Sequence, residues 1–144
     1  MNYGRREDDL FLSEKRRKRS IVISENDRIA ACIVKIRDDN TCQMCGKRVE
    51  GRNCQWSHII PRTHWSIRWY TPNQFTACFR CHKLVWHDHP MKGAAWAQEH
   101  FGKRYLDDID KHDVLVKVND LWVGEWNRAL KAEYLRIYGF AWKV

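Results

Sequence analysis

Four of the six cysteines fall into two C-x2-C pairs, Cys42 with Cys45 and Cys78 with Cys81. Each pair can present two thiolates from one tight turn, and four sulfurs are the number that a tetrahedral structural zinc ion takes. A redox-active C-x-x-C needs only one pair, usually near a βαβ pattern, and that pattern is not visible in this sequence. The spacing therefore predicts a structural zinc ion (Zn2+) on these four cysteines.

Cys54 lies between the two pairs and leaves a second arrangement open, with two zinc sites in place of one. One ion would then be held by residues of the first half and one by residues of the second half: Cys42, Cys45, Cys54 and His58, and Cys78, Cys81 with His82 or His87. The number of zinc ions per chain separates the two arrangements. The sixth cysteine, Cys32, recurs with Ile29 and Ile33 at helical spacing, which predicts a buried position.

Polar residues that could do acid-base chemistry lie between the cysteine pairs and directly after them. His58 has a reference pKa of about 6.5, so its imidazole could take a proton from water near neutral pH. Asn73 precedes the second cysteine pair, and His82 follows Cys81 directly. His82 and His87 are five positions apart, which would not place them on one face of an α-helix.

The order of these residues resembles that of the HNH nucleases, the zinc-knuckle branch of the ββα-metal (His-Me finger) fold. That family has a strand ending in a His, a loop, an Asn before a second strand, and a C-x2-C-H that leads into a helix. The likeness covers residues 42 to about 90. It implies a metal-dependent DNA endonuclease in which His58 activates water, Asn73 orients His58 through its side-chain carbonyl, and His82 helps to bind Mg2+ or Mn2+.

The sequence departs from the family pattern at Ser57. Many members have an acidic residue at this position, where it binds the catalytic metal, so Ser57 is carried over only as a tentative ligand. Between Asn53 and His89 the only acidic residue is Asp88. The departure keeps an alternative open, a catalytically inactive DNA-binding module stabilised by zinc. A weaker likeness of residues 96–102 is to bacteriophage-type recombination nucleases of the family.

The elements that must position these residues follow from the local patterns. Ser24 is a good N-cap, with Asp27 at the capping-box position, and it predicts the start of an apolar-striped helix. Alternating residues predict strands over 55–60 and 74–78, and a short helix over 80–87. After Pro90 the sequence predicts a helix with an apolar face formed by Met91, Ala94, Ala95 and Phe101. Gly102 is expected to end this helix. A last helix with a Trp-rich stripe is expected over 119–138, ended by Gly139.

These elements predict an α+β fold: a ββα-metal core with a four-cysteine zinc site, flanked by N- and C-terminal helices. We expect a basic N-terminal arm over residues 1–23 and a single HNH nuclease domain over 24–144. Within that domain the core would occupy residues 40–90 and a helical extension residues 91–144. The Trp-rich stripe is also compatible with a third function, a protein-docking face.

The charge of the chain favours a polyanionic partner, because the formal net charge is +8. Basic side chains surround the expected site with almost no acid among them: Arg62, Arg68, Arg80 and Lys83. We expect them to bind DNA, either double-stranded or branched. No apolar run approaches the roughly 20 residues that a membrane span requires. The charged segment 1–20 lacks the apolar region of a secretory signal, so the expected location is the cytoplasm, including the host cytoplasm for a phage protein. The oligomeric state is not predicted.

Overall fold

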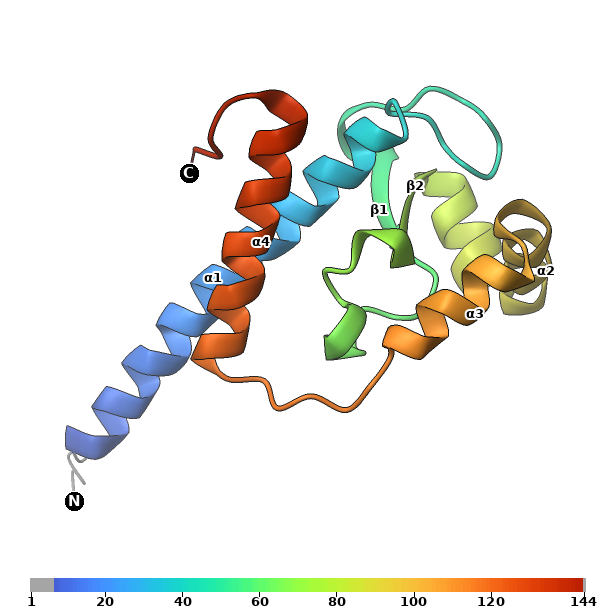
Figure 1. The fold of residues 1–144 in the computed structure, drawn as a ribbon. Helices are drawn as coiled ribbons and strands as arrows, with labels where there is room; N and C mark the ends of the chain where they lie inside the picture. Colours follow the sequence, from blue (N-terminus) through green and yellow to red (C-terminus); the bar gives the residue numbers. More distant parts are fainter. Residues whose placement is uncertain (1–6, 144) are drawn as a thin grey trace, which may run out of the picture. The chain divides into compact units, whose positions relative to one another are not determined.

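The computed structural model describes residues 7–143 (Figure 1). Its helices and strands are α1 Glu7–Arg37, η1 Gly51–Asn53, β1 Cys54–His58, η2 Trp65–Ile67, η3 Thr71–Asn73, β2 Gln74–Cys78, η4 Cys81–His87, α2 Pro90–Phe101, α3 Lys103–His112 and α4 Asp120–Tyr138. They form two compact units, one of residues 7–29 with 117–143 and one of residues 30–116. No helix in the described part of the chain combines the length and the apolar character needed to span a membrane.

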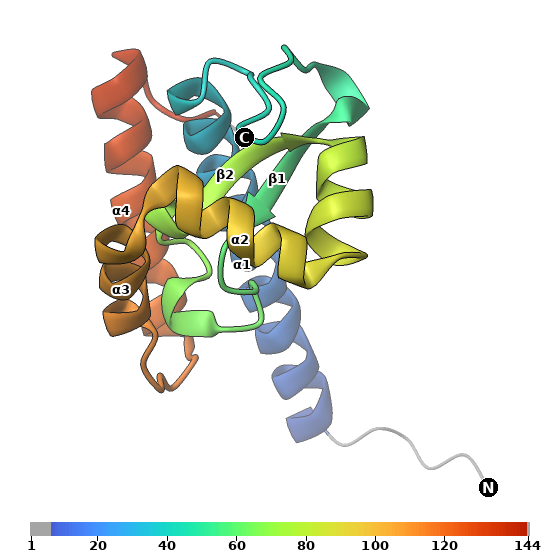
Figure 2. The same cartoon turned by 90° about the vertical axis from the view of Figure 1, so that its right-hand side faces the viewer.

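The centre of the second unit is an antiparallel pair of strands followed directly by a helix. Cys54 pairs with Cys78 and His58 with Gln74, so β1 and β2 match along their whole length. The helix η4 begins three residues after β2, and α2 lies in the foreground of the paired strands in Figure 2. The predicted α+β class, with a ββα core, cysteines close together and flanking helices, is confirmed. The first strand begins one residue earlier than predicted and ends at His58.

Strand β2 is buried along its whole length because both of its long sides are covered. On one side it pairs with β1, and on the other its backbone bonds the segment that follows α1. Asp38 accepts a hydrogen bond from Thr76 N–H at 2.7 Å, and Arg37 donates to the Gln74 carbonyl at 2.7 Å. Phe75 and Ala77 pack into the core with Val49. An edge of the sheet that would otherwise expose unpaired groups is thereby satisfied.

The first helix starts much earlier than the sequence analysis predicted. It runs without a break from Glu7, and Ser24 is an exposed interior residue of the helix instead of its N-cap. The charged residues 14–19 are good helix formers with no Pro or Gly among them, so nothing stops the helix from extending through them. The part of the predicted basic arm over residues 1–6 lies outside the described residues. Ile29 and Ile33 are buried as predicted, but Cys32, at the edge of their stripe, is only half-buried.

For α2, the sequence predicts the bounds of the helix correctly but not the face that is buried. Gly102, with a φ of 80°, ends α2 as expected. The predicted apolar face of α2 is wrong, because Met91 is 87% exposed and the buried positions are Gly93 and Ala97. These small residues are buried because large aromatic rings pack against this side of α2, as at Gly93, where a ring of Trp86 comes within contact distance.

The other unit joins the N-terminal part of α1 to α4. Asn119 caps α4 by accepting a hydrogen bond from Trp122 N–H at 2.9 Å, and Gly139, with a φ of 74°, ends it. Asn26, buried in α1, donates to the Val123 carbonyl at 3.1 Å. Lys131 makes an ion pair with Glu25 at 3.1 Å. The predicted helix over 119–138 is therefore confirmed, and polar side chains join it to α1 inside the unit.

Candidate active site

The sulfur atoms of Cys42, Cys45, Cys78 and Cys81 gather into one cluster in which all lie within 4.8 Å of one another. The distance from Cys45 Sγ to Cys78 Sγ is 3.9 Å. Four sulfurs at about 2.3 Å from a tetrahedral zinc ion would be separated by about 3.8 Å, so the cluster has the size that zinc requires. The first pair is held by a turn in which Gly46 N–H bonds the Cys42 carbonyl at 2.8 Å with a φ of 71° at Gly46.

The ionisation of these thiols favours a bound cation. Burial raises the pKa of Cys42, and burial together with hydrogen bonding to Cys78 raises the pKa of Cys81. Burial also acts to raise the pKa of Cys78, but hydrogen bonds from Cys81, Cys42 and Cys45 outweigh it and lower that pKa. The Cys78 thiolate is thus stabilised by its neighbours, while burial disfavours the thiolates of Cys42 and Cys81. Only a cation at the centre would stabilise four thiolates together, which is the chemistry of a zinc site.

The alternative with two zinc sites is contradicted by the position of Cys54. Among residues 7–143, the four clustered cysteines are the group of potential ligands close enough to hold an ion. Cys54 is buried, and its Sγ lies 3.9 Å from Asn40 Oδ1. Burial raises the pKa of the Cys54 thiol, as expected for an inert core cysteine. Cys42 and Cys45 share their cluster with the second pair because the first knuckle bonds β2 directly, with Gln43 N–H donating to the Thr76 carbonyl at 2.9 Å.

His58 is the last residue of β1, and its imidazole is held in one tautomer. Its Nε2 lies 3.2 Å from the carbonyl oxygen of Arg68. A carbonyl can only accept, so Nε2 carries a proton, and in the neutral imidazole Nδ1 is then the basic nitrogen. The same carbonyl accepts a hydrogen bond from Gln74 Nε2 at 2.8 Å, and Trp56 Nε1 donates to Gln74 Oε1 at 3.0 Å. The acceptor of the His58 proton is therefore itself fixed by a buried network.

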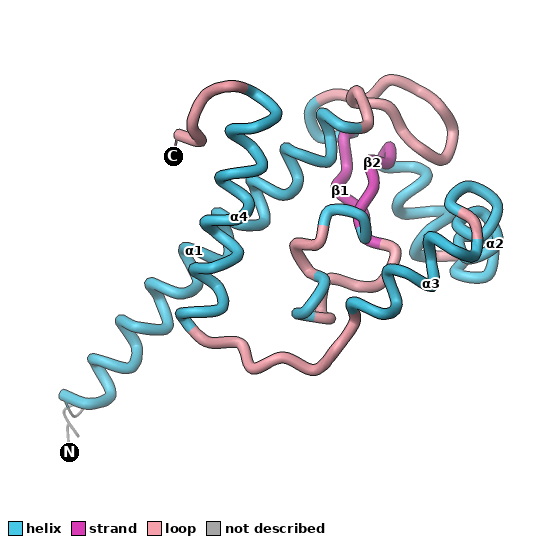
Figure 3. Tube along the Cα trace, in the orientation of Figure 1, coloured by secondary structure: helices cyan, strands magenta, loops and turns pink. Residues whose placement is uncertain are grey.

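Asn73 supports the loop after His58 and not the ring of His58. Its side-chain carbonyl accepts a hydrogen bond from Ile60 N–H at 2.8 Å in place of the predicted contact with His58. Its amide group donates to the carbonyls of Ile60 at 2.9 Å and Ile67 at 3.4 Å. Asn73 is fully buried, and the long connection that it crosses is the pink segment between β1 and β2 in Figure 3. It acts on His58 only through the backbone that follows that residue.

His82 and His87 come together because η4 is a π-helix. Their Nε2 atoms lie 2.9 Å apart. A π-helix pairs residues five positions apart, so the expectation that these two histidines would not share a face is wrong. Burial lowers the pKa of His82, and the charge of His87 lowers it further. Both effects favour a neutral His82 imidazole, whose nitrogen lone pair is available to a cation. His82 and His87 are thus the residues at the site that could hold a catalytic metal.

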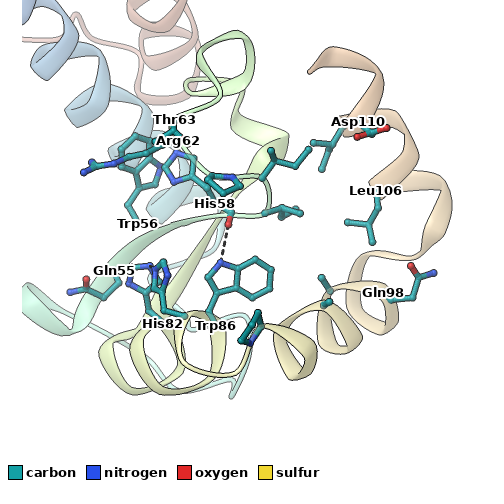
Figure 4. A pocket seen from close by; sticks show the side chains of 18 of the residues that line it. Gln55, Trp56, His58, Arg62, Thr63, His82, Trp86, Gln98, Leu106 and Asp110 are labelled. Atoms are coloured by element: carbon teal, nitrogen blue, oxygen red, sulfur yellow. Dashed lines mark hydrogen bonds between the residues drawn. The ribbon is translucent and has the colours of Figure 1, made fainter. Parts of the chain in front are cut away.

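These groups share one cleft of about 1040 Å3 (Figure 4). His58, His82 and Trp86 lie on one side of it, and Gln98, Leu106 and Asp110 lie on the other. Asp107 also lines the cleft. The sequence analysis missed both carboxylates, because α3 follows the HNH-like segment and no local pattern shows that it returns to the cleft. The site is therefore less depleted of acidic residues than residues 53–89 alone indicate.

The four basic residues expected to bind DNA do not all lie at the cleft. Of the four expected DNA-binding residues, Arg62 lines the cleft, while the other three are not among its lining residues. The guanidinium of Arg68 lies 4.7 Å from the centre of the Trp65 ring, Lys83 makes an ion pair with Asp88 at 3.5 Å, and Arg80 is exposed.

Ser57 is completely buried and does not line the cleft. Its Oγ has no hydrogen-bond partner among the described residues. The structure thus does not bring this hydroxyl into the group formed by His58, His82 and His87. The position that often carries an acidic ligand in the family supplies no visible ligand to the cleft of this chain.

Comparison with known proteins gives one finding that agrees with this geometry. The family model of the HNH endonucleases matches residues 42–85, which contain both cysteine pairs, both strands and His82. No curated protein and no solved structure is significantly similar to the chain. The match to the HNH endonuclease family and the four clustered cysteines thus fall on the same segment of the chain, residues 42–85.

Proposed function

We propose that the protein is a metal-dependent DNA endonuclease that hydrolyses phosphodiester bonds with His58 as its general base. The observation that carries the proposal is the position of His58, which lines the cleft while its Nε2 lies 3.2 Å from the Arg68 carbonyl oxygen. The lone pair on Nδ1 can take a proton from water near neutral pH. His58 lies in the same cleft as His82, His87 and Arg62, so a base and positive charge are available to one phosphate group.

In this reaction the proton of the attacking water passes to His58 Nδ1. The water oxygen forms a bond to phosphorus while the bond from phosphorus to the leaving sugar oxygen breaks, and that oxygen takes a proton from a solvent water. The cation, when bound, supplies charge that stabilises the transition state and the leaving oxygen. His82 and His87 would hold it. Two imidazole nitrogens are softer ligands than the oxygens that Mg2+ prefers, so we expect Mn2+ to activate better than Mg2+.

The four-cysteine cluster would hold a structural zinc ion that supports this cleft without taking part in the chemistry. Cys78 ends β2 and Cys81 begins η4, so the ion would tie the strand to the helix that carries His82 and His87. Binding of this kind contributes on the order of 10 kcal/mol at neutral pH, comparable with the stability of a whole domain. Free thiolates of this kind persist in a reducing compartment, which supports an action in the cytoplasm.

The substrate class follows from charge and from the position of Arg62. Its guanidinium lines the cleft and could clamp a phosphate with two hydrogen bonds. The formal net charge of +8 favours a polyanion such as double-stranded or branched DNA. If about six phosphates are neutralised, binding should weaken by roughly three orders of magnitude between roughly 50 and 200 mM salt.

One observation favours a second candidate, an inactive DNA-binding module that keeps the zinc-stabilised fold. Ser57 occupies the position where many members carry an acidic metal ligand, and it is buried outside the cleft. Without a carboxylate there, metal binding depends on the two histidines of η4. The candidates differ in whether the protein cuts the DNA that it binds.

Plasmid and branched DNA, incubated with zinc-loaded protein and Mn2+ or Mg2+, test the proposal. We expect nicking by the natural chain and by His64→Ala, a control whose imidazole bonds Asp113 at 2.8 Å. We expect His58→Ala to bind DNA with unchanged affinity and to lose nicking. Salt-sensitive binding without cleavage by the natural chain would support the inactive module. Nicking that survives in His58→Ala would reject His58 as the base.

A further inference from the structure

Trp86 lies where η4 meets the end of β1 and the helix α2. It lies in η4 between His82 and His87, and its side chain lines the cleft beside His58. Its indole Nε1 donates a hydrogen bond to the backbone carbonyl of His58 at 3.0 Å, the dashed line in Figure 4. A side chain of the metal-binding helix is thus bonded to the peptide group of the expected base.

The indole is held in this position by the backbone of α2. Gly93 is buried, and a Cβ atom at this position would lie 2.8 Å from Cε3 and 3.2 Å from Cζ3 of Trp86. Carbon atoms do not approach this closely, so any side chain at position 93 would displace the indole. Phe75 and Trp96 contact other sides of the ring, with centroids at 5.2 and 6.0 Å. A shift of the indole toward the cleft would move its N–H relative to the His58 carbonyl.

We propose that Trp86, seated on Gly93, is a positioning residue that fixes the backbone of the base His58. The proposal rests on the proposed function, because it concerns the same base. The imidazole is held at Nε2 by the Arg68 carbonyl, and the peptide that carries it is held by the Trp86 indole. With both ends fixed, Nδ1 is held at one place in the cleft. Helix α2, outside the matched segment 42–85, thereby takes part in setting the geometry of the reaction.

The variant Trp86→Phe tests this contact, because phenylalanine keeps an aromatic ring and removes the N–H donor. We expect the single-turnover rate on bound DNA to fall about tenfold, as loss of one hydrogen bond to a catalytic group allows. DNA affinity and zinc content should stay unchanged. Trp122→Phe is the matched control. It makes the same change of side chain in α4, in the unit that does not hold the cleft, so its cleavage rate should be that of the natural chain.

Gly93→Ala tests whether α2 acts through the indole. Alone it should lower the rate by about tenfold to a hundredfold, because a displacement of about 1 Å at a reacting group has effects of that size. Combined with Trp86→Phe it should add little, because the contact that it disturbs is already absent. If the loss of rate in the double variant equals the product of the losses in the two single variants, Gly93 does not act through Trp86. A rate for Trp86→Phe equal to that of the natural chain would overturn the proposal itself.

The magnetic resonance signals of the His58 imidazole give a readout that needs no cleavage. In zinc-loaded protein without Mn2+, we expect Trp86→Phe and Gly93→Ala to shift the His58 ring signals and Trp122→Phe to leave them in place. Unshifted signals in both variants would overturn the positioning role even if the protein cuts DNA. Shifted signals in a protein that cuts no DNA would uphold the positioning role and reject the proposed function. If Trp86→Phe fails to fold, Gly93→Ala carries the same test with the indole present.

Discussion

The loop after His58 depends on one buried amide, and Asn73→Ala removes it. Asn73 is fully buried and makes hydrogen bonds of 2.8 and 2.9 Å to the two backbone groups of Ile60, with a longer one of 3.4 Å to Ile67. Alanine at this position leaves the half-buried N–H and carbonyl of Ile60 without these partners. Their desolvation is no longer offset, which is more costly than the loss of two exposed hydrogen bonds.

The free energy of unfolding should fall by about 2–4 kcal/mol. Each of the two shorter bonds contributes about 1 kcal/mol, and buried groups left without partners add to the loss. For a chain of this size the change corresponds to a decrease of roughly 8–16 °C in Tm. The control is Asn119→Ala, which removes one capping hydrogen bond of 2.9 Å in the other unit. It should cost about 1 kcal/mol and leave cleavage unchanged.

Thermal melting followed by circular dichroism gives the stability, and hydrogen exchange of segment 59–67 gives the location of the effect. We expect faster exchange at Ile60 in Asn73→Ala, together with slower cleavage, because the backbone after His58 is released. An exchange rate at Ile60 equal to that of the natural chain would refute the loop-stapling role. A Tm no lower than that of Asn119→Ala would refute the energetic reasoning.

Three further outcomes follow from the residues that we propose as metal ligands. Chelation of zinc should unfold residues 42–85, because on the order of 10 kcal/mol of binding energy is lost, and a melting curve unchanged by complete zinc removal would contradict this. Cys54→Ser should leave one zinc ion per chain by metal analysis, since the Cys54 thiol lies outside the four-sulfur cluster, and a fall in zinc content would show otherwise. His87→Ala should raise the Mn2+ concentration needed for half-maximal cleavage by at least about tenfold, while the neighbouring His89→Ala should not. An equal response of the two variants would reject His87 as a ligand.

The sequence predicted well the parts of the molecule that depend on local spacing. The C-x2-C pairs, the strand that ends at His58 and the helix bounded by Asn119 and Gly139 can all be recognised from neighbouring residues. The match of the HNH family to residues 42–85 agrees with the same spacing. The start of α1 was missed because Ser24 has the residue type of an N-cap, although nothing before it ends a helix. Capping preference alone does not show whether a helix is already present.

Features that depend on distant residues could not be predicted. The proximity of His82 and His87 requires a π-helix, whereas the ordinary α-helical period places residues five apart on different faces. Asp107 and Asp110 reach the cleft only because α3 packs back on the core. The contact of Gly93 with Trp86 is likewise a property of packing, since a small residue in a helix has many uses. The sequence could show which groups are present but not which of them meet.

The rate of one turnover on pre-bound DNA, compared between the natural chain and His58→Ala, tests the central claim most directly. Zinc-loaded protein in excess over a DNA fragment, started by addition of Mn2+, removes differences in binding from the comparison. Loss of a general base should lower this rate by about 10²- to 10⁴-fold, with the affinity for DNA unchanged. A His58→Ala variant that cleaves at the rate of the natural chain would contradict the assignment of His58 as the residue that activates water.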